Sequence, residues 1–584
     1  MSLALILGLN SIGVSQQSDR ADYSWMFSFN GPPEDPAIRS FNICFENEDV
    51  KVQKVKNPFA IRGCNASYAD ENGNILMYTN GIHIADSSLQ IMENGDSISE
   101  MSINTIFKYY KNGYPFTKTA MFLPVTKDKY ILLMPLVDTI FIDQPIFTTK
   151  YIVFTKIEFN KEHPLGLVTK KRQTVWTDTL ISLNTTACRH ANGRDWWFIT
   201  QRDQSGIFLR FLIDSSGIKG PWFQEFPIPK LPYYNAASAF TPDGTKYCHI
   251  DAQFGIQLFD FDRCTGELSN FRYLIMPYEA PIGDIVISPN NRFLYALTGS
   301  HVIQFDLNTT DLASFKASAD TVGYTDLKYN YTNFAVGALA PDGKIYITTS
   351  SGDYILSTIT YPDKKGKECK FEIAGLELPS INGLGSMPNF PNYRLGPVDG
   401  SVCDSLGIDN VPKSRFRINH DTMDVFTKEF TDLSFREPID WFWTFGDGAT
   451  STEINPIHNY SSTGVYEVCL TVSNVNGSDT SCKELGIWTV STKEEKEAEL
   501  FVYPNPTIDK LTISLNEGVS AKQEWQIKIF DLQGSMLYEG GMQAYSNAHT
   551  IDVHDLASGM YILELSDREG KVLRRKFVKS SITN

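Results

Sequence analysis

Few side chains in this sequence stand in a pattern that could do chemistry. The nine histidines form neither HExxH nor HxH, the spacings that place two imidazoles on one metal ion. No GxSxG nucleophile turn, Walker A loop or GxGxxG phosphate loop stands in the strand-to-helix context that its chemistry needs. The sequence therefore predicts no catalytic residue, no metal site and no cofactor.

One acidic residue is conspicuous, because Asp447 stands between two glycines in the stretch WFWTFGDGATS, residues 441–451. A carboxylate there could bind calcium, but no further acidic residues cluster nearby to supply a shell of about six to eight oxygens. Gly446 and Gly448 permit the backbone angles of a sharp reversal, and the carboxylate of Asp447 can accept hydrogen bonds from nearby backbone N–H groups. We predict that this motif turns the chain.

Trp196 and Trp197 are the only candidates for ligand binding that the sequence singles out, because an indole ring can stack on a sugar. The stretch NGRDWWFIT reads as a turn followed by a strand, in which neighbouring side chains point to opposite faces. At least one of the two rings is therefore expected to pack between sheets.

The nine cysteines are dispersed without a CxxC pair, which disfavours a structural zinc site and allows disulfides in an exported chain. Cys469 and Cys482 flank the hairpin-like turn SNVNGSD, and we predict that they form a disulfide across it. The odd number of cysteines leaves at least one thiol unpaired.

The elements that would position such residues recur along residues 1–396. Small or apolar residues lead to a polar turn and then to an aromatic or aliphatic strand, and the turns centre on Asn72, Asp128, Asn192, Asp243, Asn290 and Asp342. Recurrence at about 50 residues, with about four short strands in each unit, is typical of a β-propeller. We predict seven blades within residues 20–398, with six or eight as alternatives, and expect residues 23–55 to pair with 381–396 to close the ring. Acidic residues such as Asp243 are interpreted as turn formers.

The bulk properties limit the classes of partner. A chain of 584 residues is expected to hold three or four domains. Its formal charge of −16 argues against nucleic acid and anionic membranes as partners. An apolar run over Leu3–Leu9, followed by small residues, predicts a signal peptide over residues 1–15, with a first strand of the propeller as the alternative. No later apolar run reaches the length of about 18 residues that a membrane span needs.

The propeller region resembles those of large secreted proteins from Bacteroidetes-type bacteria. The resemblance rests on DENGNILMYTNGIHIADSSLQIMENGD, HANGRDWWFIT and SMPNFPNYRLGP. That family has no well-defined activity, so the resemblance implies an architecture rather than a function.

Residues 412–490 resemble the PKD repeat, an immunoglobulin-like β-sandwich. The matching positions are Trp443, Phe445, Gly446, Asp447, Gly448, Pro456, His458, Tyr460, Gly464, Tyr466, Val468, Leu470 and Val472. Thr444 departs from the family, which most often has Asp after the tryptophan. Alternation places Trp441, Trp443 and Phe445 on one face of a strand, and we predict that this face lies in the core of the sandwich.

A charged linker at residues 491–499 precedes a third all-β segment, residues 500–584. This segment resembles the C-terminal sorting domain of the Por, or type IX, secretion system. The matching landmarks are Tyr503, Pro504, Asn505, Pro506, Asp531, Gly534, Gly559, Tyr561 and Lys576. The resemblance implies an export address that is read at the outer membrane by the type IX machinery and is usually cleaved there.

The predicted fold class is therefore all-β, a seven-bladed β-propeller followed by two small β-sandwich domains. The predicted function is that of an exported cell-surface or secreted binding protein, with the propeller as platform and the PKD module as spacer or contact. A glycan or a surface protein is the expected partner. A polysaccharide- or peptide-degrading enzyme with its active site in the propeller funnel is the alternative. Three or more acidic or histidine side chains at one funnel mouth would favour that enzyme, and a structural part of surface filaments is a third possibility.

Overall fold

The computed structural model describes most of the chain. The described residues are 18–28, 40–47, 49–99, 113–142, 144–180, 185–203, 205–228, 236–251, 255–274, 282–325, 333–350, 352–380, 385–419, 424–488, 500–515, 525–542, 548–567 and 572–580. The predicted signal peptide and linker lie outside these residues. Residues 1–487 form one compact unit and residues 488–584 a second, and each is described by itself.

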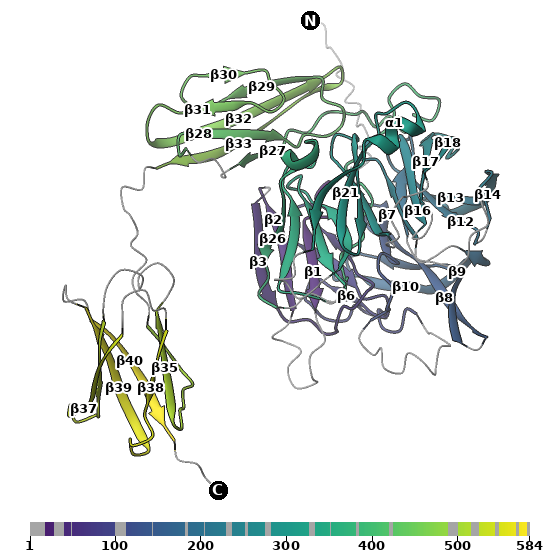
Figure 1. The fold of residues 1–584 in the computed structure, drawn as a ribbon. Coiled ribbons are helices and arrows are strands. Elements are labelled where there is room, and N and C mark those ends of the chain that lie inside the picture. The colour runs from purple at the N-terminus through teal and green to yellow at the C-terminus, as the bar shows by residue number, and fades with distance from the viewer. Residues whose placement is uncertain are drawn as a thin grey trace, which may run out of the picture. The chain divides into compact units, whose positions relative to one another are not determined.

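Seven antiparallel sheets follow one another through the described part of residues 24–377 (Figure 1). The first sheet consists of β1 (Ser24–Ser28), β2 (Ser40–Glu46) and β3 (Asp49–Val55), and the second of β4 (Ala66–Ala69), β5 (Ile75–Thr79) and β6 (Ile84–Asp86). The third consists of β7 (Met121–Thr126), β8 (Lys129–Ile142), β9 (Gln144–Glu158) and β10 (Leu167–Leu180). The next two are β11 (Ala187–Arg189), β12 (Trp196–Gln201), β13 (Ile207–Asp214) and β14 (Gly217–Glu225); β15 (Ala236–Phe240), β16 (Lys246–Asp251), β17 (Gly255–Phe261) and β18 (Leu268–Leu274). The last two are β19 (Ile282–Ile287), β20 (Phe293–Thr298), β21 (His301–Asp306) and β22 (Asp320–Tyr324); β23 (Phe334–Leu339), β24 (Ile345–Thr349), β25 (Ile355–Ile359) and β26 (Phe371–Glu377).

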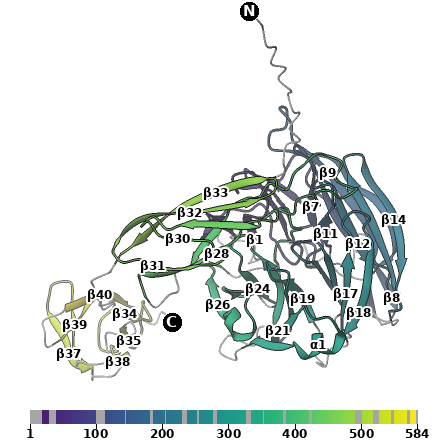
Figure 2. The same cartoon turned by 90° about the horizontal axis from the view of Figure 1, so that it is seen from above.

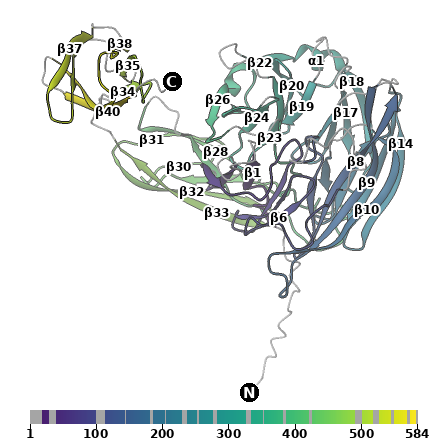
Figure 3. The ribbon, with the colours of Figure 1, turned by 90° about the horizontal axis from the view of Figure 1, so that it is seen from below.

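The repeated turns explain this order. Each of the six predicted turns joins the first strand of a sheet to its second, as the turn at Asp342 joins β23 to β24. Gly244 and Gly343 adopt positive φ angles of 71° and 77°, the backbone region that only glycine enters without strain. The first strands of successive sheets lie side by side, for example β15 with β19 and β19 with β23. The sheets therefore surround a common centre, as Figures 2 and 3 show, and the predicted all-β propeller is confirmed.

The way the ring closes differs from the prediction. The N-terminal strands form a sheet of their own, β1–β2–β3, and do not pair with residues 385–396, the described part of the predicted partner stretch. This sheet packs face to face on the last one, with Trp25 and Phe45 against Tyr346 and Leu356 in one apolar cluster. Burial of aromatic faces, rather than exchange of a strand, joins the two ends of the ring. Two short helices lie beside these sheets. The helix α1 (Leu312–Ala317) contacts β18 and β21, and η4 (Gly366–Cys369) contacts β22.

The first sandwich consists of two sheets, β27–β28–β31 and β30–β29–β32–β33. Its strands are β27 (Phe416–Asn419), β28 (Thr427–Asp432), β29 (Asp440–Thr444), β30 (Thr450–Ser451), β31 (Ile457–Asn459), β32 (Gly464–Asn474) and β33 (Gly477–Ile487). Trp443 and Phe445 are buried between the sheets, against Val468, Leu470 and Val472. The alternation of β29 and β32 thus fills the core as the sequence predicts, with Trp441 half-buried at its border.

The second unit contains a further sandwich, with sheets β34–β35–β38 and β37–β36–β39–β40. Its strands are β34 (Leu500–Tyr503), β35 (Lys510–Leu515), β36 (Trp525–Phe530), β37 (Met536–Met542), β38 (Ala548–Asp552), β39 (Gly559–Ser566) and β40 (Val572–Lys579). Tyr561 packs in its core and donates a hydrogen bond to the carbonyl of Ala557, 2.6 Å away. Asp531 accepts bonds from two backbone amides and forms a turn that ends at Gly534. None of the described helices is long and apolar enough to cross a membrane.

Candidate functional site

A cavity of about 640 Å³ lies between the propeller and the first sandwich, on the side of the repeated turns. Its propeller wall includes residues from the first strands β11, β15, β19 and β23 and from the turns that follow three of them. Residues 388–392, 394 and 395 also line it, as do Asp22, Lys118, Asp363 and Lys364. The opposite wall consists of residues 432–435 and 454–455 of the sandwich. A volume of this size is within the range of small-molecule sites, about 300–1,000 Å³.

Two arginines at the start of the sandwich hold the two walls together. Arg415 donates hydrogen bonds to the hydroxyl of Tyr23 at 2.5 Å and to the carboxylate of Asp19 at 2.9 Å, and its guanidinium lies 5.0 Å from the ring centres of Tyr23 and Phe435. Arg417 donates to the backbone carbonyls of Asp342, at 2.6 Å, and of Thr360, at 3.1 Å. These contacts fix the sandwich on the repeated turns.

The alternation of β27 places these arginines. Phe416 points into the core of the sandwich, so Arg415 and Arg417, on either side of it, point outward. Both are nevertheless buried, with 9% and 5% of their surface exposed, because the propeller covers them. Sequence reasoning missed this interface, and its one local signal was a pair of arginines on the outward face of an edge strand.

The connection between propeller and sandwich is also held in place. A disulfide joins Cys264, in the turn after β17, to Cys403, 139 residues further along the chain. Asn474 of the sandwich donates to the carbonyl of Asn410, and Asn476 donates to the carboxylate of Asp399. The second disulfide joins Cys469 to Cys482 across β32 and β33, the pairing that the sequence predicts. The sequence carried no signal for the long-range pair.

Most of the charged side chains around the cavity are already paired with one another. Lys118 lies 2.6 Å from the carboxylate of Asp284, and both are buried. Arg394 donates to Asp22 at 2.5 Å, with 18% and 8% of the two side chains exposed. The third pair is that of Arg415 with Asp19. Burial raises the pKa of Asp284, but the ammonium of Lys118 and the backbone N–H of Gly337 oppose that rise.

Two acidic side chains of the cavity wall are held by backbone amides. Burial raises the pKa of Asp363 and of Asp432, as it would for a general acid. Each carboxylate, however, accepts a hydrogen bond from a backbone amide, Asp363 from Asn290 and Asp432 from Ser434. Burial raises the pKa of the Cys188 thiol to about 12, so this thiol in the cavity wall stays protonated at neutral pH. Within the described ranges, no three His, Cys, Asp or Glu side chains converge as metal ligands would.

A histidine near the cavity is held neutral. The imidazole of His249 lies between sheets, with Nδ1 2.8 Å from the hydroxyl of Ser238, a residue of the cavity wall. Burial lowers the pKa of His249 to about 4. Because Tyr247 also donates to this hydroxyl, at 3.1 Å, Ser238 is held by hydrogen bonds within its own sheet, between β15 and β16.

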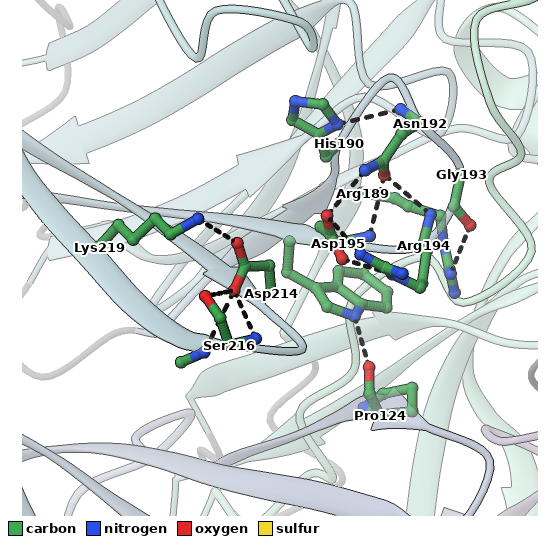
Figure 4. A network of polar contacts seen from close by, with 12 residues as sticks. Pro124, Arg189, His190, Asn192, Gly193, Arg194, Asp195, Asp214, Ser216 and Lys219 are labelled. Atoms are coloured by element: carbon green, nitrogen blue, oxygen red, sulfur yellow. Dashed lines mark hydrogen bonds and ion pairs between the residues drawn. The ribbon is translucent and has the colours of Figure 1, made fainter. Parts of the chain in front are cut away.

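Trp196 and Trp197 do not offer a stacking surface, and this prediction is corrected. Their exposed fractions are 0% and 4%. The indole of Trp196 donates to the carbonyl of Pro124, as Figure 4 shows, and that of Trp197 donates to the carbonyl of Arg263. Because alternate strand residues point to opposite faces of β12, each ring is buried against a different neighbouring sheet.

The turn before these tryptophans contains a network of polar contacts (Figure 4). Asn192 accepts hydrogen bonds from the amides of Arg194 and Asp195 and donates to the Asp195 carboxylate at 2.7 Å. Arg189 donates to the carbonyl of Gly193 and stacks on the ring of Trp196 at 4.3 Å. These polar groups shape the turn and position β12 for packing.

Asp447 is likewise a turn former, and it has one partner that the sequence did not suggest. Its carboxylate accepts a hydrogen bond from the amide of Ala449 at 3.0 Å, and its other oxygen lies 2.7 Å from His458 Nε2. Burial alone would raise the pKa of Asp447, but these two interactions outweigh it and lower the pKa. The imidazole stacks on Phe445 at 4.2 Å, which joins the motif to the core.

Comparison with known families identifies the two sandwiches. Residues 415–488 match the PKD domain, and residues 501–580 match the secretion system C-terminal sorting domain. The chain carries a PKD domain and a sorting domain. The sorting domain marks the chain for export by type IX secretion to the cell surface or the extracellular space.

Individual relatives cover only parts of the chain. An ulvan lyase from Nonlabens ulvanivorans is 30% identical over 142 residues, which are 24% of this chain and 25% of that protein. The collagenase ColA from Bacillus cereus is 51% identical over 41 residues, 7% of this chain and 4% of that protein. The chain thus spans a quarter or less of the length of these curated relatives.

Solved structures resemble separate parts of the chain. The PKD1 domain of the Vibrio cholerae metalloprotease PrtV is 30% identical, with a TM-score of 0.13, over 13% of this chain and 98% of that domain. A quinoprotein alcohol dehydrogenase-like protein from Bacteroides thetaiotaomicron is 11% identical, with a TM-score of 0.31, over 63% of this chain and 77% of that protein. At these scores, neither likeness bears on activity.

Proposed function

We propose that this exported chain is a non-catalytic binding protein whose ligand occupies the cavity between the propeller and the PKD domain. The observation that carries the proposal is the cavity itself, which is of ligand size and has two walls from different domains. The PKD domain then forms one wall of the binding site and contacts the ligand directly, which a spacer would not do. A glycan or a surface protein remains the expected class of partner.

The chemistry of the cavity supports binding over turnover. The acids and bases that could transfer protons are used to hold backbone amides or to neutralise neighbouring charges. A general acid or base must instead present its proton-exchanging atom to the substrate at hydrogen-bond distance. Half-buried rings of Phe240, Phe390 and Phe435 add apolar surface to the same walls.

A second candidate function is a secreted enzyme that degrades a polysaccharide. The observation in its favour is the 30% identity to an ulvan lyase over 142 residues. The raised pKa values of Asp363 and Asp432 also fit a general acid. The hydrogen bonds to both carboxylates make this the weaker candidate.

A panel experiment tests the proposal. The fragment 16–487, which ends with the first compact unit, is applied to arrays of glycans and surface proteins, and every bound panel member is then incubated and analysed by mass spectrometry. We expect binding without turnover, and we expect Asn290→Trp, at the cavity mouth, to weaken it while Asn72→Trp, in the equivalent turn of another sheet, does not. Turnover of a bound panel member, or equal binding by both variants, would overturn the proposal.

A further inference from the structure

We infer that the cavity selects an uncharged oligosaccharide, and this inference rests on the proposed function. The charges of the cavity are its first support. Lys118 with Asp284, Arg394 with Asp22, and Arg415 with Asp19 form three pairs in or beside its walls. A charged ligand would lose its hydration on entry and would find these counter-ions already engaged, which makes its burial unfavourable.

The remaining charged groups do not change this balance. Asp363 and Asp432 are held by backbone amides, and Lys364 is a solvent-exposed residue at the rim. Arg189, which also lines the cavity, donates hydrogen bonds to the backbone carbonyls of Gly193 and Tyr393. An ammonium in water attracts an anion only weakly, because solvent and salt screen the interaction. The buried charged groups of the walls therefore already have ionic or hydrogen-bond partners within the protein.

Two amides at the cavity mouth are placed to bind hydroxyl groups. The side-chain oxygen of Asn290, on the propeller, accepts hydrogen bonds from the Ser288 hydroxyl and the Arg292 amide. The side-chain oxygen of Asn455, on the PKD domain, accepts one from the amide of Asp432. These bonds orient each side chain and leave its NH₂ group, with two donors, to the ligand. Donors on both walls suit a chain of sugar hydroxyls that crosses the mouth.

The backbone around the cavity argues against a peptide as the ligand. Three of the turns place a proline in the wall, at Pro242, Pro289 and Pro341. Proline has no N–H, so these positions cannot donate the main-chain hydrogen bonds by which a peptide adds to a strand edge. A saccharide needs no such backbone donors, and its C–H faces can pack on the half-buried rings of Phe240 and Phe435.

Binding of defined oligomers tests the inference. Calorimetric titrations of the fragment 16–487 use four neutral tetrasaccharides, cellotetraose, xylotetraose, mannotetraose and chitotetraose. Tetragalacturonate and a proline-free, uncharged tetrapeptide amide are titrated in parallel. We expect binding of a neutral tetrasaccharide with a Kd that changes less than about twofold between 50 and 500 mM salt, because no ionic pair forms.

Matched variants locate the binding. Loss of one neutral hydrogen bond should weaken binding about three- to tenfold for Asn290→Ala and for Asn455→Ala. Asn72→Ala, in an equivalent propeller turn, and Asn459→Ala, on an exposed strand of the PKD domain, should leave the Kd unchanged.

The outcomes separate the inference from the proposed function. Binding of only tetragalacturonate or only the tetrapeptide, weakened by Asn290→Ala, would overturn the neutral-saccharide inference and keep the cavity as the site. Neutral saccharide binding that none of the variants changes would overturn both the inference and the cavity site. If none of the six probes binds while the panel ligand does, the inference fails and the binding function stands.

Discussion

We expect the docking of the PKD domain on the propeller to depend more on Arg415 than on any residue in the core of either domain. Arg415→Ala removes hydrogen bonds to Tyr23 and Asp19 together with the stacking between two rings. Hydrogen bonds to a charged group contribute about 1.5–3 kcal/mol each. Asp19 keeps 28% of its side chain exposed, so water replaces part of the loss. We expect the docking free energy to fall by about 2–3 kcal/mol, which raises the undocked population about 30- to 140-fold.

Hydrogen exchange of the fragment 16–487 measures this change directly. The amides of β27 that point away from its partner β28, and those of the turn at Asp342, should exchange faster by that factor, because the docked domains shield them from water. The amides of β32, in the core of the PKD domain, should keep their protection. Arg202→Ala is the control, because its pair with Asp178 joins two propeller sheets away from the interface.

Two results would refute the reasoning. If Arg415→Ala leaves exchange at the interface within about threefold of the unmodified chain, the arginine does not hold the domains together. If β32 loses protection as much as β27, the substitution has destabilised the PKD domain itself. If Arg202→Ala accelerates exchange at the interface equally, the effect belongs to general stability.

Three further predictions concern the two sandwiches. Deletion of residues 501–584 should leave the protein in the periplasm on cell fractionation, and normal surface display would contradict the sorting role. Because the pKa of Asp447 is lowered in the folded state, its stabilising effect is present above about pH 4 and is lost as the pH falls through the folded pKa. The acid unfolding of Asp447→Asn, followed by circular dichroism, should therefore depend less steeply on pH; an unchanged slope would show that the carboxylate is not involved. Replacing Cys469 and Cys482 by serine should cost about 3 kcal/mol for a separation of 13 residues, and an unchanged urea midpoint would contradict this.

The sequence predicts those parts of the fold whose causes are local. Asp243 and Asp342 make their turns through bonds to residues two positions away, so the turns can be recognised without a structure. The prediction for the first sheet was wrong because the stretch between β1 and β2, FNGPPEDPAIR, does not look like a hairpin. Its Asn-Gly pair is followed by prolines rather than by strand-forming residues. Pairing of Cys264 with Cys403 depends on how the whole ring folds, and no spacing in the sequence reports it.

The acidic residues of the cavity show why catalytic potential could not be predicted by counting. Asp22, Asp363 and Asp432 come from the turn before β1, from the loop after β25 and from the PKD domain, so only the folded chain brings them to one cavity. Once there, Asp22 neutralises Arg394, and Asp432 accepts bonds from the Ser434 amide and from the indole of Trp441. Hydrogen bonds of this kind stabilise the ionised form of a carboxylate and oppose the rise in pKa that burial causes. The ability of each acid to donate a proton therefore depends on its hydrogen-bond partners, which the number of acids in the sequence does not report.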